Sequence, residues 1–181
     1  MRQSRRTFVT AVAVFAGGCL GSRRSSTSKA DSDSDNHSDS DGDGVPDHAD
    51  TYPTDDRRAF RSFQMDGTET LRPGQFSAVA LTNSPRASGD ILHYDIAVDG
   101  STEVDCLVFE REAYDAYQNG NRDVSIISEY SRTGVTEATL TRTLDKGEYI
   151  FALDYTDLVT DPGETTVTVT RWLELSEPAD R

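Results

Sequence analysis

The sequence predicts an all-β fold, an antiparallel β-sandwich of about eight strands with Greek-key-like connections. Three observations lead to this prediction. Apolar and polar residues alternate in short runs between residues 58 and 177, with the period of half-buried strands. The runs are rich in β-branched and aromatic residues. Breaks that contain Gly, Asn or Asp separate them at the short spacing that is typical of sandwiches.

The individual elements follow from the alternation and the breaks between runs. Only residues 110–118 look helical, because Tyr114 and Tyr117 stand three positions apart. Residues 144–149 resemble a tyrosine corner, in which the hydroxyl of Tyr149 would bond to upstream backbone. The predicted strands cover residues 60–65, 76–81, 92–98, 103–109, 124–130, 135–143, 149–155 and 167–173.

The first 18 residues predict export. The apolar run from Phe8 to Ala16 is too short to cross a hydrocarbon core of about 30 Å and has the length of a signal-peptide core. Arg5 and Arg6 stand just before it, and this arrangement resembles a twin-arginine signal. Residues 16–19 resemble a lipobox, whose Cys19 would be lipidated and become the first mature residue.

These resemblances imply an exported protein that a lipid holds on the extracellular side of a prokaryotic cell membrane. A cleaved signal without a lipid is the alternative. Residues 19–38 are predicted to form the lipid anchor and a disordered tether, because this Ser- and Asp-rich tract has almost no apolar surface to bury. Asn36 in the tether is a candidate N-glycosylation acceptor.

Charge excludes one class of partner. The chain has 32 acidic and 18 basic residues and a formal net charge of −14, so nucleic acid is disfavoured as a partner. Lys29 and Lys146 are its only lysines. An acidic, lysine-poor chain behind a twin-arginine signal resembles the exported proteins of extremely halophilic archaea. In such proteins carboxylates repel one another unless salt screens them.

Residues 39–50 carry the clearest chemical motif. Carboxylates occupy positions 1, 3, 5, 9 and 12 and Gly occupies position 6, which is the spacing of a calcium loop. Such a loop offers only oxygen donors, which suit Ca²⁺ rather than zinc or copper. The predicted ligands are Asp39, Asp41, Asp43, the Val45 carbonyl and Asp50, with Asp47 bound directly or through water.

The motif differs from an EF-hand, because position 12 is Asp, Pro46 follows position 7 and no helices flank the loop. Over residues 39–55 it resembles a thrombospondin type 3 repeat, and we assign residues 39–56 to this loop. The resemblance implies a structural calcium that stiffens a spacer. A single copy predicts weak affinity, with a dissociation constant of about 10⁻⁴–10⁻³ M. The alternative is that repetition in an acidic tether produces the spacing by accident.

No set of catalytic residues emerges, and we predict that the protein is not an enzyme. A blue-copper site fails, because no His follows Cys106; this strand cysteine is expected to be a buried apolar residue. His93 is the only His outside residues 1–50 and is predicted to face outward. An accessory surface hydrolase, or a substrate-capture subunit of a transporter, is the alternative and would need His93 or Glu110 and Glu112 in a cleft.

A binding function has more support. Four aromatic residues would line a patch beside the loop at residues 119–121, and aromatic platforms hold sugars and peptides. The expected partners are the membrane, through the anchor, and a surface protein or carbohydrate. The alternative is that the rings complete the core. The predicted patch consists of Tyr114, Tyr117, Tyr130 and Trp172.

Overall fold

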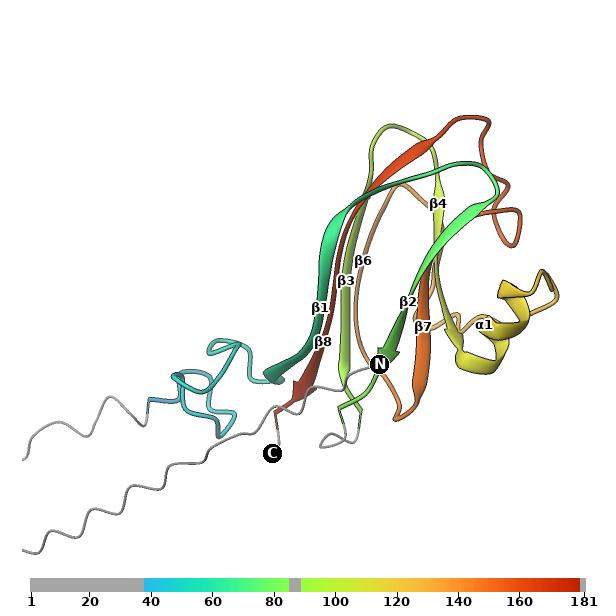
Figure 1. The fold of residues 1–181 in the computed structure, drawn as a ribbon. Coiled ribbons are helices and arrows are strands. Elements are labelled where there is room, and N and C mark those ends of the chain that lie inside the picture. The colour runs from blue at the N-terminus through green and yellow to red at the C-terminus, as the bar shows by residue number, and fades with distance from the viewer. Residues whose placement is uncertain (1–37, 85–88, 180–181) are drawn as a thin grey trace, which may run out of the picture. The chain divides into compact units, whose positions relative to one another are not determined.

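The computed structural model describes residues 38–84 and 89–179, which form eight strands and one helix (Figure 1). The predicted sites at Arg5, Arg6, Cys19 and Asn36 lie outside the described residues. The elements in chain order are β1 (Arg58–Leu71), β2 (Gln75–Thr82), β3 (Ile91–Val98), β4 (Val104–Glu110), α1 (Arg111–Gln118), β5 (Arg132–Val135), β6 (Glu137–Thr143), β7 (Glu148–Tyr155) and β8 (Val167–Pro178).

The strands form two antiparallel four-stranded sheets. One has the order β1-β8-β3-β6 and the other has the order β2-β7-β4-β5. Strand 1 pairs with 8, 2 with 7, 3 with 6 and 4 with 5, as in a long hairpin folded over on itself. This is the order of a jelly roll, which combines two Greek keys. The predicted all-β sandwich is therefore confirmed.

The alternating apolar residues meet between the sheets. Leu92, Tyr94 and Ile96 of β3 lie in one buried cluster with Phe151 and Leu153 of β7. These two strands belong to different sheets, so the cluster is the core of the sandwich. Cys106 of β4 lies in the same cluster with an exposed fraction of 0% and no disulfide, as expected. Its burial raises the pKa of the thiol to about 12.

A second, smaller cluster lies under α1. Tyr117 of the helix is fully buried against Leu107 and Phe109 of β4 and Ala152 of β7. The helix was predicted at residues 110–118, and the structure confirms it with Glu110 as the N-cap residue. The ribbon shows α1 beside β4 and β7 (Figure 1). No helix among the described residues is long and apolar enough to cross a membrane.

The predicted strand at residues 124–130 is wrong, because this segment is irregular and β5 begins only at Arg132. Ser131 accounts for the difference. Its hydroxyl accepts a hydrogen bond from the Val108 amide (2.9 Å) and donates one to the Ile127 carbonyl (2.9 Å), so a side chain replaces part of a strand ladder. The predicted strand at 135–143 likewise divides into β5 and β6 at Thr136.

The predicted tyrosine corner is also wrong. The hydroxyl of Tyr149 makes no backbone hydrogen bond within the described part of the chain, and its ring packs edge-on against Tyr130. Tyr130 pins this turn instead, because its hydroxyl donates to the carbonyl of Thr143 at 3.1 Å.

Candidate metal centre

Aspartate side chains fold the loop that precedes β1. Asp39 accepts the amide of Gly42 on Oδ1 (2.8 Å) and the amide of Gly44 on Oδ2 (3.0 Å). Both glycines have positive φ angles, 77° and 95°, which side-chain-bearing residues rarely adopt. The alternation of Asp and Gly at residues 41–44 thus gives a tight loop wrapped around the carboxylate of Asp39.

Asp41, Asp43 and Asp50 share one arrangement. In each, Oδ1 accepts the backbone amide two residues later, at 3.2, 2.7 and 2.7 Å respectively. In each, Oδ2 is buried and has no hydrogen-bond donor. A buried carboxylate oxygen without a partner is costly, so these three atoms are suited to bind a cation.

The carboxylates are also close together. One oxygen from each of Asp39, Asp41 and Asp43 lies within 4.8 Å of the others, and the exposed fraction of Asp43 is only 4%. The pKa of Asp41 is raised, first because its carboxylate loses hydration. The hydrogen bond from the Asp43 amide lowers this pKa, whereas the negative charges of Asp43, Asp50 and Asp39 raise it. Four negative charges therefore act on one another at this place, and a cation would relieve their repulsion.

Asp47 has a different role from the one its spacing predicts. Its Oδ1 accepts the amide of Ser40 (2.7 Å) and its Oδ2 accepts the Ser40 hydroxyl (2.8 Å). Hydrogen bonds from Ser38 and Ser40 lower its pKa. Asp47 therefore closes the loop on its first residues. Val45, the predicted carbonyl ligand, is partly buried in the loop, and its amide is held by Asp43.

Tyr52 and Glu174 connect the loop to the sandwich. The guanidinium groups of Arg58 and Arg61 lie 4.2 and 5.7 Å from the centre of the Tyr52 ring. Both arginines bind Glu174 of β8, at 3.1 and 2.9 Å, and the exposed fraction of the Glu174 side chain is 3%. Burial, and next the Glu174 carboxylate, raise the pKa of Tyr52 to about 12.

The sequence alone does not predict this cluster. Glu174 is separated from Arg58 by 116 positions, and its neighbours on β8 alternate as in any half-buried strand. The nearest sequence indication was the Arg57-Arg58 pair followed by Arg61 in an acidic chain.

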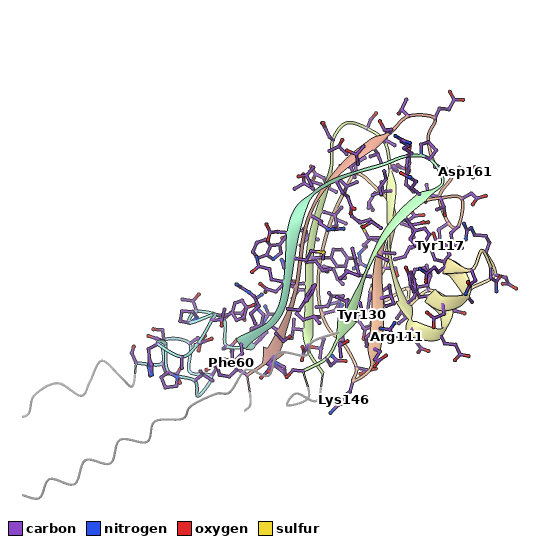
Figure 2. All side chains as sticks on the ribbon, viewed as in Figure 1. Phe60, Arg111, Tyr117, Tyr130, Lys146 and Asp161 are labelled. Atoms are coloured by element: carbon purple, nitrogen blue, oxygen red, sulfur yellow. The ribbon has the colours of Figure 1, made fainter. Side chains whose placement is uncertain are left out.

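The predicted aromatic patch does not form. Tyr117 and Tyr130 are buried, with exposed fractions of 0% and 5%, and they belong to different clusters. Figure 2 shows Tyr117 at α1, the helix to which it belongs, and Tyr130 apart from this helix. Tyr114 is partly buried against Phe76 and Phe109. Trp172 is half-buried on β8, in the β1-β8-β3-β6 sheet, where it lines a hollow of about 380 Å³.

The residues named for a hydrolase are not arranged as a catalytic site. His93 lies on β3, where Nδ1 contacts the Thr141 hydroxyl (2.8 Å) and Nε2 contacts Asp95 (3.0 Å). Strand β3 is paired on both sides, with β6 and β8. Its amides therefore belong to strand ladders and cannot stabilise an oxyanion. Glu110 and Glu112 are exposed at the start of α1.

Comparisons with known proteins give a limited context. No family model matches the sequence, and no curated protein matches it. Among solved structures, the chain is similar to one described as "Carbohydrate-Binding Module CBM36 in complex with calcium and xylotriose". The identity is 14%, the match covers 64% of this chain and 92% of that one, and the TM-score is 0.31.

Proposed function

We propose that this chain is an exported, lipid-anchored surface protein in which residues 39–50 hold one structural Ca²⁺. The observation that carries the metal site is the set of buried, partnerless oxygens of Asp41, Asp43 and Asp50. One carboxylate oxygen of Asp39 lies within 4.8 Å of oxygens of Asp41 and Asp43, and Asp50 is not part of this close group. The donors are carboxylate oxygens, which suit a hard cation such as Ca²⁺ and not zinc or copper.

The role of this ion is structural. Calcium sensors respond by moving a pair of helices, whereas the described chain on the C-terminal side of this loop continues through the irregular residues 51–57 into β1. The loop is also tied to the sandwich, because Thr51 donates its amide to the carbonyl of Ala59 (2.8 Å) and Tyr52 lies under Arg58. A bound ion would therefore stiffen the segment that precedes the domain.

Surface attachment rests on the sequence alone. Arg5 and Arg6 direct export in this proposal, Cys19 carries the lipid and residues 19–38 form the tether on the extracellular side of the membrane. Residues 58–177 then present the jelly roll for binding or for envelope structure. Catalysis is not part of the proposal, since His93 lies on a fully paired strand.

A calcium titration of the full-length chain at low and high salt tests the metal site. We expect wild type to bind about one ion with a dissociation constant of about 10⁻⁴–10⁻³ M. The double variant Asp43→Ala/Asp50→Ala should bind at least tenfold more weakly, because two of the three partnerless oxygens are gone. Asp99→Ala/Asp161→Ala is the control, since it removes equal charge from exposed positions elsewhere. Equal affinity in both variants, or no binding by wild type, contradicts the proposal.

A further inference from the structure

A groove of about 1010 Å³ lies at the end of the sandwich where β1 begins and β6 and β8 end. Its walls come from Asp56–Arg58, from residues 128–132 and from Thr141–Thr143. The amide of Ala179, just after β8, donates a hydrogen bond to the carbonyl of Arg57, just before β1, at 3.0 Å. This bond joins the two segments into one wall of the groove. Five segments of the chain thus meet here, including Ile91 of β3.

The groove collects positive charge in an acidic protein. Arg57, Arg58, Arg132 and Arg142 line it, and they are four of the ten Lys and Arg residues in the described part of the chain. Two acidic residues lie beside them, Asp56 and Glu129, although the whole chain has a net charge of −14. Counted over the lining residues alone, the local charge is positive, which favours an anionic ligand, and Asp55 and Glu174 outside the lining pair with Arg57 and Arg58.

Two of these arginines are not neutralised. Arg142 is exposed on β6, and its side chain forms no ion pair or hydrogen bond with any described residue. Arg132 donates from Nη1 to the carbonyls of Ser131 (2.6 Å) and Glu129 (3.5 Å), which fixes its guanidinium without cancelling its charge. Arg58, in contrast, is paired with Asp55 and Glu174. Arg132 and Arg142 are thus the groups available to an anion.

The rest of the lining is suited to a sugar. Ser128, Thr141 and Thr143 contribute hydroxyl-bearing side chains, of which the Thr141 hydroxyl also contacts His93 at 2.8 Å. Edge strand β6 is also blocked for strand addition at this end. There the carbonyl of Thr143 already accepts the Tyr130 hydroxyl.

We propose that this groove binds an oligosaccharide that carries carboxylate or sulfate groups, with Arg132 and Arg142 as the anion-binding residues. A guanidinium binds a carboxylate or sulfate through two parallel hydrogen bonds, whereas hydroxyl side chains exchange hydrogen bonds with sugar hydroxyls. None of the aspartates at residues 39–50 lines the groove. The proposal therefore stands or falls independently of the calcium site.

Calorimetric titration of the full-length chain tests the inference. The probes are a hyaluronan hexasaccharide, which carries carboxylates, a chondroitin sulfate hexasaccharide, neutral chitohexaose and a hexaglutamate peptide. Each is measured with EDTA and again with calcium. We expect binding of one or both acidic sugars, at least tenfold tighter than that of the neutral sugar or the peptide, in both conditions.

The variants localise the site. Arg142→Glu should weaken binding of the acidic sugar at least tenfold, and Arg142→Lys should weaken it less, because Lys keeps the charge but loses the two-point contact. The matched control is Arg72→Glu, an exposed arginine after the far end of β1. Thermal denaturation checks that all variants fold. Equal losses in Arg142→Glu and Arg72→Glu, peptide binding as tight as sugar binding, or no binding of any acidic sugar would overturn the proposal.

Discussion

At the scale of single residues, the loop shows how one residue type takes two roles. Asp41, Asp43 and Asp50 each use one oxygen to hold the backbone and leave the other buried and free for a cation. Asp39 and Asp47 use both oxygens as acceptors, Asp39 for the amides of Gly42 and Gly44 and Asp47 for the amide and hydroxyl of Ser40. A carboxylate can bind the ion when one of its oxygens has no hydrogen-bond donor nearby, and it holds the loop when donors occupy both oxygens. The position of the residue in the spacing does not by itself distinguish these two roles.

This division predicts that Asp43→Asn and Asp47→Asn have unequal effects. Asp43→Asn should weaken calcium binding at least tenfold, because it removes charge from a side chain with an exposed fraction of 4%. Asp47→Asn should change the affinity only a few fold and lower the melting temperature of the calcium-free chain, since an amide group accepts on one atom only. Calcium titration and thermal denaturation measure both. A loss at Asp47 as large as at Asp43 would restore Asp47 as a ligand.

The sequence predicts this loop only as far as the spacing of the residues determines which side chains come close together. Spacing alone predicted the approach of Asp39, Asp41 and Asp43, because a tight loop with two glycines places alternate side chains on one side. The role of Asp47 could not be predicted, because its bonds to Ser40 form only when the loop closes. The burial of Tyr117 likewise depends on how α1 packs against β4.

At the scale of elements, the calcium loop is attached to the sandwich by a small buried charge cluster. Glu174 of β8 binds Arg58 and Arg61, and these lie over Tyr52. Strand pairing brings the partners together, since β1 is paired with β8 along its length. Alternation in the sequence predicted both strands, but it carries no information on which strands pair, so the cluster was not foreseen.

Glu174→Gln should therefore loosen the loop as well as the sandwich. It removes a buried negative charge that binds the partly buried Arg58 and the exposed Arg61, so we expect a loss of about 1–3 kcal/mol in the free energy of unfolding. Limited proteolysis should cut residues 38–57 faster. Glu148→Gln is the control, because its pair with Arg111 is exposed and is worth no more than about 0.5 kcal/mol. Equal stability of the two variants would show that the cluster does not hold the loop.

At the scale of the whole molecule, the jelly-roll order places the two features of interest at the same end. Because β1 pairs with β8, the loop that enters β1 and the residues that follow β8 meet, as Arg57 and Ala179 do. The arginine groove opens there, next to the segment that continues from the acidic loop. Figure 1 shows this loop beside the first residues of β1. An acidic loop and a basic groove thus occupy one end of the domain.

The net charge of −14 makes the stability of the whole chain depend on salt. Exposed carboxylates repel one another across the surface, and salt shortens the range of that repulsion from about 10 Å at 0.1 M to about 3 Å at 1 M. We therefore expect the melting temperature to rise by roughly 5 °C or more between 0.1 and 2 M KCl, which corresponds to about 1–2 kcal/mol for a domain of this size. The variant Asp99→Asn/Glu137→Gln/Asp161→Asn/Glu164→Gln, which neutralises four exposed acidic residues, should melt higher at low salt and respond less to KCl. Sucrose is the control, because it acts by exclusion from the surface and should stabilise both chains equally. If KCl raises the two melting temperatures by the same amount, the salt effect does not come from carboxylate repulsion, and the resemblance to halophilic proteins loses its physical basis.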